Sequence, residues 1–138
     1  MAKMCDCIPP RNIRAEQVVL GCMLTNRLCV HNIQTLLNAD DFYREAHREI
    51  YEAMMTLYDK KEEVDIITVT DILRTANKLE DVGGIPYITF LANAYYTEPR
   101  FWACARTVSD KAKQRRNEVL LLEIRSLLED ILKEVSNG

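Results

Sequence analysis

Glycine and proline are scarce in this sequence, with only 4 of each among 138 residues. A sandwich or barrel of short strands needs many such turn residues, so their scarcity argues against an all-β fold. Hydrophobic residues make up 48% and charged residues 28%, which is the balance of a globular protein rather than of a disordered chain. The composition therefore favours one helical domain of ordinary size.

An excess of positive charge is also missing, because 18 basic residues face 21 acidic ones and the net charge is −3. Binding to nucleic acid without a protein partner depends on clustered Lys and Arg, so we expect no tight direct contact with DNA. The longest uncharged run, 82–97, is interrupted by Pro86 and Asn93, and residues 1–10 lack the pattern of a signal peptide. We expect a cytoplasmic protein that does not enter a membrane.

No catalytic motif can be assembled from these residues. A P-loop needs a Gly followed by Lys, but no glycine in the chain has Lys after it. His47 lies beside Arg48 and Glu49 on a predicted helix, where a hydrogen-bonded or solvent-facing His is expected rather than a catalytic base. The sequence thus predicts a protein that is not an enzyme and holds no cofactor or metal.

Paired cysteine motifs are absent too, although the chain has five cysteines: Cys5, Cys7, Cys22, Cys29 and Cys104. An odd number without a CxxC pair is typical of free thiols in a reducing cytosol. Cys5 and Cys7 could bind a metal together with His31 or His47, but a flexible N-terminus is the favoured interpretation.

Apolar residues recur at helical spacing from residue 13 to residue 95, which predicts a compact bundle of about six short helices. Asn12 is a candidate N-cap for the first of them. The pattern from Thr68 to Asp71 resembles a capping box that opens a later helix. The extended Pro9-Pro10 pair precedes the bundle. We therefore divide the chain into a lead-in (1–11), a helical body (12–98) and an arm (99–138).

Residues 100–135 contain neither Gly nor Pro, which permits one long C-terminal helix that projects as an arm, half or all of a helical hairpin. Five apolar residues in it follow the 3, 4, 3, 4 spacing of a coiled-coil seam: Leu121, Ile124, Leu128, Ile131 and Val135. We predict that this seam drives homodimerisation, with folding back onto the body as the alternative. A basic cluster precedes it, which we interpret as a solvated face rather than a DNA contact: Lys111, Lys113, Arg115 and Arg116.

The residues 9–21 (PPRNIRAEQVVLG) resemble the opening of the N-terminal domain of the bacterial replicative DNA helicase, the DnaB family. Further blocks that look like this family follow in the same order: 40–43 (DDFY), 47–53 (HREIYEA), 65–68 (DIIT), 79–84 (LEDVGG), 87–88 (YI) and 105–108 (ARTV). The resemblance covers residues 8 to about 116.

The resemblance implies a non-catalytic, all-α domain that docks primase and shapes the helicase ring during DNA replication. It implies a homodimer or higher ring oligomer, with primase as partner and a helicase loader as a further candidate. The alternative is a free-standing regulator of plasmid or phage type that mimics this domain to bind a host helicase or primase.

The family's primase-facing positions match Glu16, Tyr87 and Ile124 of this sequence. Each has a competing structural role. Glu16 suits the positive end of its helix equally well, Tyr87 is typical of a helix interface, and Ile124 also belongs to the seam. We therefore expect that Glu16 and Tyr87 line or support a partner surface.

Overall fold

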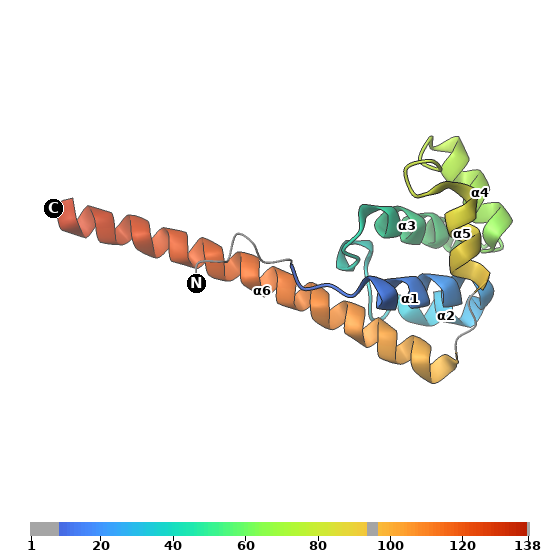
Figure 1. The fold of residues 1–138 in the computed structure, drawn as a ribbon, viewed down its shortest axis with the longest axis horizontal. Helices are drawn as coiled ribbons and strands as arrows, with labels where there is room; N and C mark the ends of the chain where they lie inside the picture. The colour runs from blue at the N-terminus through green and yellow to red at the C-terminus, as the bar shows by residue number, and fades with distance from the viewer. Residues whose placement is uncertain (1–8, 94–96, 138) are drawn as a thin grey trace.

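A computed structural model describes residues 9–93 and 97–137 of the chain, and within these ranges it is helical without any strand. Figure 1 shows a compact body from which one helix extends far to one side. The elements are α1 (Ile13–Thr25), α2 (Arg27–Ile33), the 3-10 helix η2 (Ala39–Asp41), α3 (Glu45–Asp59), α4 (Ile66–Thr75), α5 (Gly84–Asn93) and α6 (Glu98–Asn137). The predicted all-α fold with a long C-terminal helix is confirmed.

Helix α1 is the centre of the body. It contacts α2, α3, α5 and α6, so that nine of its thirteen residues are buried. The predicted N-cap is confirmed, because the Asn12 side chain accepts a hydrogen bond of 3.0 Å from the backbone N–H of Ala15. A helix that is covered on almost every side fixes the mutual positions of all its neighbours.

The prediction that Thr68 to Asp71 form a capping box was wrong, since the box lies three residues earlier. Asp65 caps α4 by accepting 2.9 Å from the N–H of Thr68, and the Thr68 hydroxyl accepts 3.0 Å from the N–H of Asp65. The reciprocal pair satisfies two backbone donors of the helix terminus. It allows α4 to begin at Ile66 and so to include both isoleucines of the 65–68 block.

A glycine turn sets the start of α5. Gly83 has a φ of 111°, and a Cβ added there would lie 2.7 Å from the Cβ of Tyr87. Only glycine adopts that conformation without strain and also leaves room for the tyrosine. The turn therefore fixes Tyr87 in the first turn of α5.

Helix α6 has two halves in different surroundings. Its first half packs on α1 through residues at helical spacing: Phe101, Ala105, Val108, Ser109 and Ala112. From residue 117 to residue 137 every side chain is exposed, and Figure 1 shows this half clear of the body. We call residues 117–137 the distal arm. Within the described residues, no helix is both long and apolar enough to cross a membrane.

Candidate functional site

Three polar side chains meet where α1, α3 and α5 begin. Glu16, His47 and Tyr87 each lie in the first turn of their helix. Glu16 and His47 are 1% and 0% exposed, whereas Tyr87 is half-buried. Buried polar groups of this kind are retained only when each has hydrogen-bond partners.

His47 joins the other two residues. Its Nδ1 lies 2.7 Å from Oε1 of Glu16, and its Nε2 lies 2.7 Å from the Tyr87 hydroxyl. The second Glu16 oxygen accepts a bond of 2.7 Å from the backbone N–H of Tyr43. Both oxygens are therefore paired, at the short distances of charge-assisted hydrogen bonds. We call Glu16, His47 and Tyr87 the relay.

The relay reaches the surface only at Tyr87. The Tyr87 hydroxyl also accepts from Nε2 of Gln17 at 3.1 Å and from Nη1 of Arg44 at 3.5 Å. The guanidinium of exposed Arg44 lies 5.7 Å from the centre of the Tyr87 ring, and the exposed Phe90 ring stacks on that ring at 6.0 Å. We call Arg44, Tyr87 and Phe90 the Tyr87 surface, which offers a cation beside two aromatic rings.

Of the three partner residues predicted from the sequence, the structure thus joins two. Glu16 is not available for direct contact, because it is buried, and His47 connects it to Tyr87. Ile124 lies elsewhere, eight residues beyond Arg116 on the exposed distal arm, or about 12 Å along the helix axis. Of the two roles expected for His47, hydrogen-bonded or solvent-facing, the structure shows the first.

Two arginines attach α6 to the body where the distal arm begins. Arg115 donates to the backbone oxygens of Pro10 and Asp41, at 2.8 and 2.7 Å. Arg116 pairs with Oδ1 of Asp41 at 2.9 Å, while Oδ2 of the same carboxylate accepts from the N–H of Asn38. These bonds tie α6 to the lead-in and to η2.

The interpretation of the basic cluster as a solvated face was therefore wrong for Arg115, which is half-buried, whereas Arg116 is exposed while it pairs with Asp41. Burial lowers the pKa of Arg115 from its ordinary value, with Glu16 and Asp41 opposing the effect. The centre of the Tyr43 ring lies 5.0 Å from the guanidinium group of Arg11 and 5.5 Å from that of Arg115. The backbone N–H of Tyr43 also donates to Glu16, so Tyr43 contacts both the relay and Arg115, which lies just before the distal arm.

The distal arm carries ten large apolar residues, each at least half exposed: Val119, Leu120, Leu121, Leu122, Ile124, Leu127, Leu128, Ile131, Leu132 and Val135. All five residues of the predicted seam are among them. Nothing in the described part of the chain covers this surface. Single exposed leucines are common on protein surfaces, but ten large apolar side chains on one helix segment are not.

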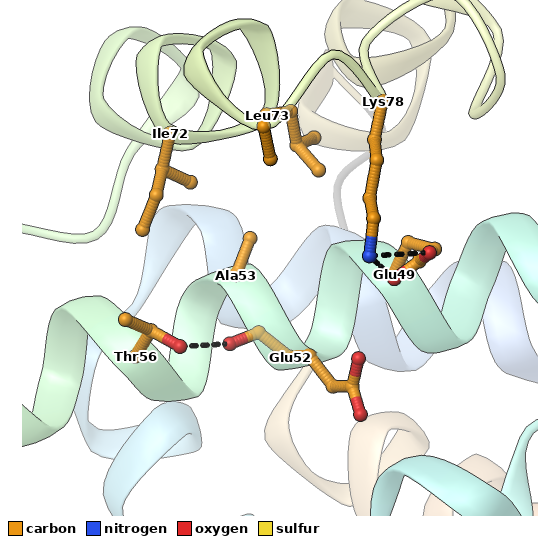
Figure 2. Close-up of a pocket in the computed structure, with 8 residues that line it drawn as sticks. Glu49, Glu52, Ala53, Thr56, Ile72, Leu73 and Lys78 are labelled. Carbon is orange, nitrogen blue, oxygen red and sulfur yellow. Dashed lines mark hydrogen bonds and ion pairs between the residues drawn. The ribbon is translucent and has the colours of Figure 1, made fainter.

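Figure 2 shows the crevice between α3 and α4, where Lys78 reaches across to the Glu49 carboxylate. Its Nζ lies 2.9 Å from Oε2, and the Thr56 hydroxyl donates 2.9 Å to the Glu52 carbonyl of its own helix. The Lys78 ammonium and the Glu49 carboxylate at this crevice thus pair with each other. Across residues 9–93 and 97–137, no three His, Cys, Asp or Glu side chains converge as a metal site requires.

The described cysteines Cys22, Cys29 and Cys104 are free thiols. Burial raises the pKa of Cys22 to about 12, with smaller contributions from Cys29 and Cys104. Burial likewise raises the pKa of the Cys29 and Cys104 thiols. Such thiols react slowly, because the thiolate is the nucleophile. Cys5 and Cys7 lie outside the described residues.

Comparison with known proteins assigns the fold to a class. The family model of the DnaB-like helicase N terminal domain matches the sequence of this chain over residues 8–110. The chain is similar to the N-terminal domain of DnaB helicase from Mycobacterium tuberculosis, with a TM-score of 0.81 and 31% identity, covering 92% of this chain and 89% of that one. It is also similar to a chain of a DnaB-like replicative helicase whose structure was described with its interactions with primase, with a TM-score of 0.70 and 28% identity, covering 85% of this chain and 27% of that one.

Curated relatives agree with this class. The chain is 42% identical over 111 residues to replicative DNA helicase DnaC of Bacillus subtilis, and 39% identical over 109 residues to replicative DNA helicase DnaB of Geobacillus stearothermophilus. These matches cover 80% and 79% of this chain but 24% of each relative. The chain belongs to the DnaB-like helicase N-terminal domain family, and it spans about a quarter of the length of these relatives.

Proposed function

We propose that this chain is a non-catalytic docking and oligomerisation domain of a replicative DNA helicase, which binds primase and shapes the helicase ring in the cytoplasm. The observation that carries the proposal is the division of one family fold into a packed body and an uncovered apolar arm. The matched portion of the relatives is their N-terminal domain only. A structural neighbour was described with its interactions with primase, which supports primase as the partner.

In this proposal the distal arm is the self-association surface. Its seam consists of Leu121, Ile124, Leu128, Ile131 and Val135. Burying one such side chain contributes about 1.5–3 kcal/mol. Five per chain outweigh the several kcal/mol of rigid-body entropy that pairing costs. We therefore expect association in roughly the micromolar range, as a homodimer or as a higher ring oligomer.

The body is the primase-docking surface in this proposal. Tyr87 and its exposed neighbours Arg44 and Phe90 supply a rigid aromatic and cationic contact, and Glu16 supports Tyr87 from within. Aromatic and Arg side chains are the groups that most often dominate binding energy at protein interfaces. Ile124 adds an apolar contact from the arm.

The test is titration of the domain with the primase encoded by the same genome, which we call the cognate primase. Light scattering should give the mass of a complex, and Tyr87→Ala should weaken binding at least tenfold while the domain stays folded. Ile67→Ala is a matched control, because Ile67 is an apolar side chain that is 71% exposed on α4. Unchanged binding by folded Glu16→Ala and Tyr87→Ala variants would refute the assignment of these residues.

A further inference from the structure

We propose that His47 is a positioning residue for the Tyr87 surface, through which the buried Glu16 fixes the direction of the hydrogen bond made by the Tyr87 hydroxyl. The bond directions stand on the geometry of this chain alone. Their effect on a partner rests on the proposed function. The juxtaposition is specific, since the three residues come from three helices and are 31 and 40 positions apart.

The Glu16 end of the relay sets one direction. Both carboxylate oxygens are acceptors, one receiving the N–H of Tyr43 and the other facing Nδ1 of His47 at 2.7 Å. The Nδ1 atom must therefore carry the proton. The Glu16 end thus fixes a proton on Nδ1, and the bond between Nε2 and the Tyr87 hydroxyl is decided at the Tyr87 end.

The Tyr87 end fixes the direction of the second bond. A phenolic oxygen accepts two hydrogen bonds and donates one. Its two acceptor positions are occupied by the amide of Gln17 at 3.1 Å and the guanidinium of Arg44 at 3.5 Å, and a guanidinium only donates. The remaining contact, to Nε2 of His47, must be the donation.

The consequence is a tyrosine held in one state. Its ring lies parallel to the His47 ring, with 5.9 Å between centres and 7° between planes, and Gly83 fixes its backbone. The hydroxyl proton of Tyr87 points toward His47, so the acceptor side of the hydroxyl oxygen faces the surface. There it accepts from Arg44, whose guanidinium lies over the Tyr87 ring. Glu16 thereby organises the Tyr87 surface without touching a partner.

The substitution Glu16→Gln reverses this chain of bonds. The Gln carbonyl takes the N–H of Tyr43, so its amide nitrogen must donate to Nδ1 of His47. The proton then moves to Nε2, which donates to Tyr87. The hydroxyl oxygen now faces three donors with two acceptor positions, so Arg44 is displaced.

The first experiment reads the tautomer of His47 by long-range proton–nitrogen NMR on the full chain. We expect the Nδ1-protonated form in the wild type and the Nε2-protonated form in Glu16→Gln. Tyr87→Phe serves if Glu16→Gln does not fold, and it should keep the Nδ1-protonated form because Glu16 is intact. His31 is the internal reference, since it is exposed and contacts Tyr58. A wild-type His47 protonated at Nε2, or a tautomer that Glu16→Gln leaves unchanged, would overturn the relay.

The second experiment measures binding of the cognate primase in a double-mutant cycle. Glu16→Gln and Tyr87→Phe should each weaken binding roughly tenfold, and the double variant no further, because both act through one hydroxyl. The variant Tyr58→Phe, at the exposed His31 pair, is the control. Additive losses, or unchanged binding in Glu16→Gln with a reversed tautomer, would contradict the positioning role. If the wild type binds no primase, the proposed function fails while the tautomer still decides the relay.

Discussion

The body and the distal arm contain the same kinds of apolar residue but differ in how much of these side chains is exposed to solvent. In α1, nine of thirteen residues are buried against four other helices. In the distal arm, the ten large apolar side chains are 50–71% exposed. An apolar face on a helix must be covered by a partner surface. If that surface lies in the same chain, the contact stabilises the fold, and if it lies in another chain, the contact stabilises an assembly.

The boundary between the two regions is marked by charge. Arg115 and Arg116 bind the lead-in and η2, and from residue 117 onward the helix has no further packing on the body. The same helix is therefore part of the core at Phe101 and a free surface at Ile124. Paired substitutions in the two regions test whether this division holds.

The largest difference should come from truncating apolar side chains. Phe101 is 1% exposed and packs edge-on to Trp102, so Phe101→Ala should cost about 3–5 kcal/mol of unfolding free energy. Leu127→Ala, at a residue 62% exposed, should change it by less than about 0.5 kcal/mol when the chain is monomeric. Urea unfolding at sub-micromolar concentration measures both. Equal losses would show that the arm is packed on its own body.

A second large effect should follow loss of the central relay residue. His47→Ala leaves a buried carboxylate without one of its partners, which should cost about 3 kcal/mol. His31→Ala, at an exposed histidine, should cost less than about 0.5 kcal/mol. Thermal or urea unfolding of the two variants under identical conditions gives the comparison. A tolerated His47→Ala would mean that Glu16 is paired by other means.

The joint between the regions should contribute an intermediate amount. Arg115→Met keeps the apolar stem and removes hydrogen bonds to the carbonyls of Pro10 and Asp41, so we expect a loss of about 1.5–3 kcal/mol. Lys113→Met, at an exposed basic residue two positions away, is the control and should be nearly neutral. The comparison is made by urea unfolding. If Lys113→Met is as harmful as Arg115→Met, the loss reflects charge rather than anchoring.

The smallest effect that we expect is on the unfolding free energy at alkaline pH, and it comes from a buried thiol of the body. The pKa of the Cys22 thiol rises from 9.0 to about 12 in the folded body. The unfolded chain therefore releases this proton first. The contribution of Cys22 to stability is complete below pH 9 and declines as pH rises from 9 toward 12. Cys22→Ala should flatten the fall in unfolding free energy between pH 8.5 and roughly 10.5, and an unchanged slope would assign that fall to other groups.

The sequence predicts those features that depend on local spacing. The N-cap at Asn12, the helix of α1 and the uninterrupted α6 follow from capping chemistry and from the absence of Gly and Pro. The predicted position of the capping box of α4 was wrong, because a threonine such as Thr68 suits either the N-cap position of a box or its third helical position. The structure shows that Asp65 is the cap.

The contacts that make the site are not local, and this is why the sequence does not reveal them. Glu16 and Tyr87 were found by resemblance, but their connection through His47 depends on three helices meeting at their first turns. Arg115 and Arg116 fall in a basic cluster whose facing direction the sequence leaves open. The packing of α6 on α1 and on η2 directs them toward Asp41.

The most direct test of the division into body and distal arm is the mass of the chain in solution, measured by light scattering. The wild type should exceed the 16.0 kDa of one chain as concentration rises through the micromolar range. Ile124→Asp with Leu128→Asp should remain at 16.0 kDa with an unchanged unfolding midpoint in the monomer. A wild type that stays monomeric at high concentration, together with a double variant that unfolds, would contradict the account and place the seam within a single chain.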